Sequence, residues 1–72
     1  MMDIWQHFSL PYSETVTLHA AVRASDWRAG IDRAKSDDPV WGRPDVNYHG
    51  TEMFNPTVAR VRHKRGFIAW LQ

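Results

Sequence analysis

The sequence carries four histidines, the side chains best suited to bind a metal or transfer a proton near neutral pH. They are His7, His19, His49 and His63, and no two of them have the i, i+4 spacing that places two ligands on one helix face. The segment from His49 to Glu52 could lend two ligands to one ion, whereas a zinc site needs three or four. The chain has no cysteine, which excludes disulfides and thiolate sites. We therefore expect no metal and no cofactor.

No sequence motif indicates an enzyme. The chain lacks the nucleophile elbow, the phosphate-binding loop and the dinucleotide fingerprint. A chain of 72 residues is one small domain, which leaves little volume for a substrate pocket of about 300 Å³ or more. We predict a binding protein without catalytic residues.

The strongest local signal is a basic segment. From Thr57 onward the chain has four bases, Arg60, Arg62, Lys64 and Arg65, and no acid, whereas the preceding part has five bases and all eight acids. Strand alternation places Arg60 and Arg62 side by side on one face. The segment is either a solvated face that discourages edge aggregation, or a contact surface whose guanidinium groups bind phosphate or carboxylate.

A second signal is the tryptophan of the loop at residues 39–44, Pro-Val-Trp-Gly-Arg-Pro. Trp41 either fills the core or anchors an interface, and Arg43 follows it closely. Tryptophan and arginine dominate the energetics of protein interfaces. The two signals together predict a partner-binding set of Arg60, Arg62, Lys64, Arg65, Trp41 and Arg43.

The elements that must position these side chains begin with strands. Residues 4–10 alternate between two faces and form either a strand or a short helix. Residues 14–23 show the alternation of a half-buried strand, with one apolar face made of Val16, Leu18, Ala20 and Val22.

A helix is expected next, with Ser25 as its N-cap. Its apolar stripe consists of Trp27, Ile31 and Ala34. Gly30 allows this helix to approach the sheet closely.

Three further strand segments are predicted in the C-terminal half. Residues 46–54 form a strand with a bulge at Gly50. Residues 57–63 and 67–72 form a hairpin whose short loop uses Gly66 at a positive φ. One helix on an antiparallel sheet of three to five strands makes an α+β two-layer sandwich. Its expected core comprises Val16, Leu18, Val22, Trp27, Ile31, Val61, Phe67, Leu71 and also Trp70.

Residues 1–72 are expected to form a single domain, in which residues 1–13 are an N-terminal arm or an edge strand. No apolar run approaches the roughly 20 residues of a membrane helix, and no signal peptide is recognisable. These features favour a cytoplasmic protein. Its small core also favours stabilisation by a partner, either a second copy in a homodimer or a different protein.

The stretch from Thr15 to Ala34, TVTLHAAVRASDWRAGIDRA, passes from an alternating strand into a Ser-capped helix, and an antiparallel hairpin follows. In this arrangement the chain resembles the small βαββ proteins of phages and mobile elements, among them anti-CRISPR proteins that bind type I effector complexes. The resemblance implies a stoichiometric inhibitor in a bacterial host. Such an inhibitor binds the effector through its protein subunits or its crRNA backbone, and blocks DNA recognition or nuclease recruitment.

Two other functions stay open at this point. The chain could be a nucleic-acid-binding regulator that uses the basic hairpin directly, or an assembly module of a phage or toxin system. The sequence pI of about 8.3 is lower than the pI above 9 that is typical of nucleic-acid-binding domains, which slightly disfavours the regulator.

Overall fold

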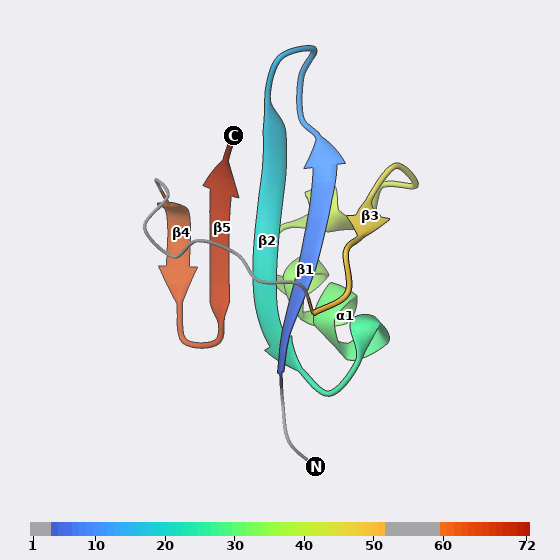
Figure 1. Ribbon diagram of the computed structural model, residues 1–72, viewed down its shortest axis with the longest axis vertical. Helices are drawn as coiled ribbons and strands as arrows, with labels where there is room; N and C mark the ends of the chain where they lie inside the picture. Colours follow the sequence, from blue (N-terminus) through green and yellow to red (C-terminus); the bar gives the residue numbers. More distant parts are fainter. Residues whose placement is uncertain (1–3, 52–59) are drawn as a thin grey trace.

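The computed structural model describes residues 4–51 and 60–72, and for residues 60–64 it describes the backbone. In these ranges an antiparallel sheet of five strands carries one α-helix, α1 (Trp27–Asp37), on one face (Figure 1). This is the predicted α+β two-layer sandwich. The strands lie in the order β3-β1-β2-β5-β4, and their bounds are β1 (Ile4–Pro11), β2 (Thr17–Ala24), β3 (Asn47–Tyr48), β4 (Arg60–Lys64) and β5 (Phe67–Leu71).

The longest pairing joins β1 and β2 in register along the full length of both strands. The alternation of residues 4–10 therefore marks a strand, and the short-helix alternative is wrong. β1 also pairs with β3 on its other side, so it lies inside the sheet and is not an edge strand. β2 begins later than predicted because residues 12–16 turn the chain, with the amide of Tyr12 donating to the carbonyl of Val16.

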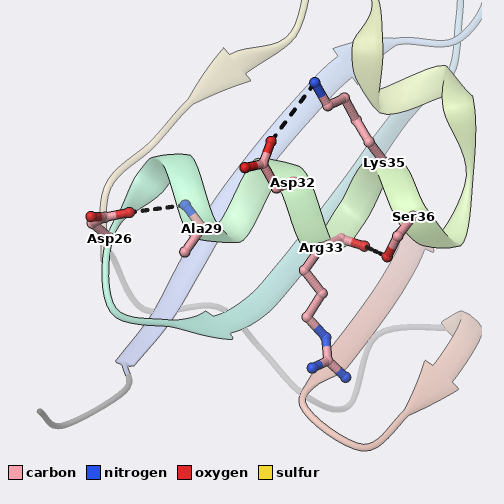
Figure 2. A network of polar contacts seen from close by, with 6 residues as sticks. All are labelled: Asp26, Ala29, Asp32, Arg33, Lys35 and Ser36. Carbon is pink, nitrogen blue, oxygen red and sulfur yellow. Dashed lines mark hydrogen bonds and ion pairs between the residues drawn. The ribbon is translucent and has the colours of Figure 1, made fainter.

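The N-cap of α1 is Asp26, one residue after the predicted Ser25. Asp26 is extended, with φ −155°, and its Oδ1 accepts a hydrogen bond of 2.9 Å from the amide of Ala29 (Figure 2). Serine and aspartate are about equally good caps, so the side-chain type could not decide between neighbouring positions.

Asp38 ends α1 and starts the 3₁₀-helix η1 (Pro39–Gly42). The ring of Pro39 disfavours helical backbone at the residue before it, and Asp38 is extended with ψ 122°. Its backbone amide donates to the carbonyl of Ala34, and its carboxylate accepts from the amide of Val40 at 3.0 Å. This double cap directs η1, and with it Trp41, back over the sheet.

The main core lies between α1 and the sheet. Gly30 brings α1 close to β1, because a Cβ at this position would lie only 3.0 Å from a ring carbon of Phe8. This confirms the predicted close approach. The buried side chains of this core are Phe8, Leu10, Leu18, Ala20, Val22, Ala34, Trp41, Phe67 and Ala69.

The predicted core is partly right. The structure buries the predicted Leu18, Val22, Phe67 and Trp70, and half-buries Val16 and Ile31. The side chain of Val61 lies outside the described part of the chain.

Two predicted core residues are exposed. Trp27 is 49% exposed because the buried stripe of α1 runs through Gly30 and Ala34, which leaves Trp27 at its margin. Leu71 is 43% exposed because it is the last residue of β5.

The C-terminal strands are shorter than predicted. Only Asn47 and Tyr48 of residues 46–51 pair in β3, and Gly50 lies in a turn at φ +72° rather than in a bulge. Residues 52–59, which complete the predicted strand and begin the next one, lie outside the described ranges. The hairpin prediction is confirmed: β4 and β5 meet at a turn in which Gly66 has φ +71°. Neither helix in these ranges is long and apolar enough to span a membrane.

Candidate functional site

The basic residues of β4 occupy an edge of the sheet. Arg60 pairs with Trp70 and Arg62 with Ala69, so an irregularity in register lies between the two arginines. Their partners are consecutive on β5, and consecutive residues alternate in face. The regular backbone alternation on which the prediction for Arg60 and Arg62 rested is therefore interrupted between these two residues. The side chains of Arg60, Arg62 and Lys64 lie outside what the structure describes.

Of the four predicted bases of the hairpin, Arg65 is the one whose side chain the structure describes. It is exposed in the β4–β5 turn, beside Gly66. Its carbonyl accepts a hydrogen bond from Nη2 of Arg33 on α1. The structure thus adds a helix residue to the basic region that the sequence had located in the hairpin alone.

The two predicted contact residues of the loop at residues 39–44 have different environments. Trp41 is 2% exposed and packs in the main core, which supports the core interpretation over the interface anchor. Arg43 is held by Asp45 in a bidentate pair, with Nε to Oδ1 at 3.0 Å and Nη2 to Oδ2 at 2.6 Å. The side chain of Arg43 is 43% exposed, so it contributes a polar edge that is already neutralised.

Trp41 and Arg43 nevertheless belong to one surface feature, which we call the aromatic pocket. It lies where α1, η1 and β3 meet and has a volume of about 240 Å³. Trp27 and Tyr48 are its exposed aromatic residues, at 49% and 46%. Its lining residues are Phe8, Trp27, Ile31, Lys35, Trp41, Gly42, Arg43, Val46 and Tyr48.

Tyr48 is anchored by a hydrogen bond, and Trp27 has a cation–π contact. The Tyr48 hydroxyl donates to Oε1 of Gln6, a side chain that is 1% exposed and also donates to the carbonyl of Ala24 at 3.2 Å. The guanidinium of Arg28 lies 5.3 Å from the ring centroid of Trp27, and the Trp27 and Tyr48 centroids are 6.5 Å apart. Neither ring was predicted as a site residue from the sequence, and the apolar stripe of the helix had placed Trp27 in the core.

A second polar cluster lies on the sheet face opposite α1. The strand pairing brings together three histidines from β1, β2 and the end of β3. Nε2 of His7 lies 3.0 Å from Nδ1 of His19, and Nε2 of His49 makes a hydrogen bond with Oγ of Ser9. His7 also stacks on His49, with ring centroids 4.5 Å apart, and His19 stacks on Trp70 at 5.1 Å.

Helical spacing could not reveal this histidine cluster, since it depends on strand register. The signal present in the sequence is alternation: His7 and Ser9 share one face of residues 4–10, and His19 lies opposite the apolar face of β2. In the His7–His19 bond one nitrogen donates and the other accepts, so at least one of the two rings is neutral.

The cluster does not make a metal site by geometry. The His7 and His49 rings are stacked, and the nitrogens named above are turned toward His19 and Ser9 rather than toward one common point. Within residues 4–51 and 60–72, no group of three or more histidine or acidic residues could hold a metal ion.

We expect the purified protein to carry no stoichiometric zinc, and its melting temperature to be unchanged by EDTA. Elemental analysis and a thermal melt measure the two quantities. His49→Ala is the matched variant, and zinc that is present in the parent but lost from this variant would contradict the prediction.

Comparisons of the chain with protein-family models, curated proteins and solved structures find no match.

Proposed function

We propose that this chain is a non-catalytic binding domain that docks on a protein partner through the aromatic pocket. The observation that carries the proposal is the pair of exposed aromatic rings, Trp27 and Tyr48, that line one pocket. Large aromatic side chains supply much contact area with few rotatable bonds, and they dominate interface energetics.

The anchoring of Tyr48 supports binding. An interface loses affinity when mobile side chains must be ordered. Here the Tyr48 hydroxyl is bonded to buried Gln6, and Trp27 contacts Arg28. The Tyr48 ring is therefore already ordered in the free chain.

The pocket fits a protein side chain better than a free ligand. Its volume of about 240 Å³ is smaller than the roughly 300–1,000 Å³ of small-molecule sites. Its cations are paired, Arg43 with Asp45 at 2.6 Å and Lys35 with Asp32 at 3.8 Å. Such an apolar centre with a neutral polar rim is typical of protein interfaces.

For the partner we propose a type I CRISPR effector, which the chain inhibits stoichiometrically in the bacterial cytoplasm. This choice rests on the resemblance to small βαββ inhibitors, and on the order of strand, helix and antiparallel hairpin from β2 onward. Fold alone does not determine function, so the experiment must test the effector directly.

The test measures how the purified chain changes target-DNA binding and cleavage by reconstituted type I effectors. We expect inhibition at stoichiometric concentration. Trp27→Ala should weaken it by about tenfold or more, as truncation of an interface anchor does, while the melting temperature stays close to that of the parent. Tyr12→Ala is the control, because Tyr12 is 57% exposed in the β1–β2 turn, outside the aromatic pocket.

The experiment can rule out the proposed partner and the proposed docking site independently. Absence of inhibition across several type I effectors would rule out the CRISPR partner. Full inhibition by Trp27→Ala, or an equal loss in Tyr12→Ala, would rule out the aromatic pocket as the docking site.

A further inference from the structure

Three arginines from separate parts of the chain converge at one end of the sheet. Arg23 lies near the end of β2, Arg33 on α1, and Arg65 in the β4–β5 turn. Figure 1 shows this turn at the same end of the sheet as the end of β2, and Figure 2 shows Arg33 directed from α1 toward it. Together with Gly66 they line a pocket of about 290 Å³. We call Arg23, Arg33 and Arg65 the arginine triad.

Backbone bonds hold the triad together around Gly66. The amide of Arg23 donates to the carbonyl of Gly66 at 2.9 Å, and Nη2 of Arg33 donates to the carbonyl of Arg65. A Cβ at Gly66 would lie 3.6 Å from Cβ of Arg23 and 3.7 Å from Nη2 of Arg33. The turn glycine thus lies directly between two of the arginines.

The triad has no internal counterion among the described residues. In the described ranges, no carboxylate lies within ion-pair distance of the three guanidinium groups. By contrast, Lys35 and Arg43 each form an ion pair. Asp37 and Arg33 line a neighbouring hollow together with Ser36 and Phe67. Three like charges around one pocket repel one another, and a bound anion would reverse that effect.

Donor geometry selects the anion. Each guanidinium has five N–H donors, and Arg33 is seen to use one nitrogen on the Arg65 carbonyl. A carboxylate has two oxygens, and one bidentate arginine engages both of them, whereas a phosphate keeps further oxygens free for neighbouring arginines. The triad therefore matches phosphate better than carboxylate.

We propose that the arginine triad is a binding site for phosphate, supplied either by a nucleic-acid backbone or by a free polyphosphate. The site is separate from the aromatic pocket, and its binding does not depend on the proposed effector partner. It also assigns roles to Arg23 and Arg33, which neither the basic hairpin nor the aromatic pocket includes.

The test is titration of the whole chain at low salt with inorganic tripolyphosphate and, separately, with a single-stranded oligonucleotide, by calorimetry and amide chemical shifts. We expect Arg23→Gln and Arg33→Gln each to weaken binding by about tenfold, since charge-assisted hydrogen bonds are among the strongest. Arg28→Gln is the matched control: it removes the same charge from exposed α1 surface beside Trp27, outside the triad.

Binding of tripolyphosphate alone would identify a free polyphosphate, and binding of the oligonucleotide alone would identify the backbone. For the oligonucleotide, each triad substitution should also make the log–log salt slope shallower by about 0.7–0.9. If Arg33→Gln lowers the melting temperature, Arg23→Gln still tests the site, because within the described ranges the Arg23 side chain makes no hydrogen bond or ion pair that the fold would lose. No binding of either probe, or an equal loss in Arg28→Gln, would overturn the proposal.

Discussion

Replacing Trp41 by alanine should lower the free energy of unfolding by about 3–5 kcal/mol, the usual effect of removing a buried tryptophan. Trp41 is 2% exposed and packs with Phe8, Leu18 and Phe67 in the main core. The expected loss approaches the total stability of many small domains, which is about 5–15 kcal/mol. The variant should be partly unfolded at physiological temperature. Urea denaturation followed by far-UV circular dichroism measures the change.

Trp27→Ala is the matched control, because it removes the same side chain from a half-exposed position on α1. We expect it to reduce stability by about 1 kcal/mol or less, as surface substitutions do. Equal losses in the two variants would contradict the placement of Trp41 in the core and Trp27 at the surface.

Replacing Trp70 by alanine should also reduce stability by about 3–5 kcal/mol, although Trp70 lies on the sheet face opposite α1. It is 3% exposed and belongs to a second core cluster with Ala21 and Ile68, against which Trp5 packs. Its indole stacks on His19 with an angle of 5° between the ring planes, and on His7 at 5.5 Å. Removal of the indole would leave a cavity in this cluster and take away the stacking surface of both histidines.

Urea denaturation gives the stability of this variant, and histidine ring NMR signals report the lost stacking. Both His7 and His19 signals should shift, while an Arg28→Gln variant on the opposite face should leave them unchanged. A Trp70→Ala protein as stable as the parent would show that the face opposite α1 is not a second core.

Local patterns predicted the elements well. Alternation identified the strand at residues 14–23, and helical spacing identified the helix near residues 26–36. Turn chemistry identified Gly66, since a glycine is favoured where φ is +71°. Each of these signals acts over a few residues, so it can be recognised without knowledge of the tertiary structure.

Tertiary placement was harder to predict. The periodicity of α1 grouped Trp27 with Ile31, but the close approach at Gly30 shifted the buried stripe and left Trp27 exposed. The apolar stripe of one helix predicts a core on one face of the sheet only. The structure buries side chains on both faces, with Trp41 on the α1 side and Trp70 on the opposite side.

Neither proposed binding site could be recognised in full from the sequence, and the reason is the same for both. The sequence located Arg65, but Arg23 and Arg33 join it only through the packing of α1 and the β4–β5 turn against the end of β2. The rings of Trp27 and Tyr48 meet because β3 pairs with β1 beside the start of α1. Pairings between distant segments leave no local pattern.

The strand order has a consequence for how the chain folds. β1 with β2, and β4 with β5, are hairpins of neighbouring segments, whereas β2 meets β5 from the other end of the described chain, with Leu18 opposite Leu71. Closing a loop of that length is entropically unfavourable until the contacts form, which slows folding. Until then β2 presents an unpaired apolar edge, which is prone to pair with other chains. The vulnerable stage for aggregation is therefore the interval before β5 docks, and a partner that bound only the finished sheet could not protect it.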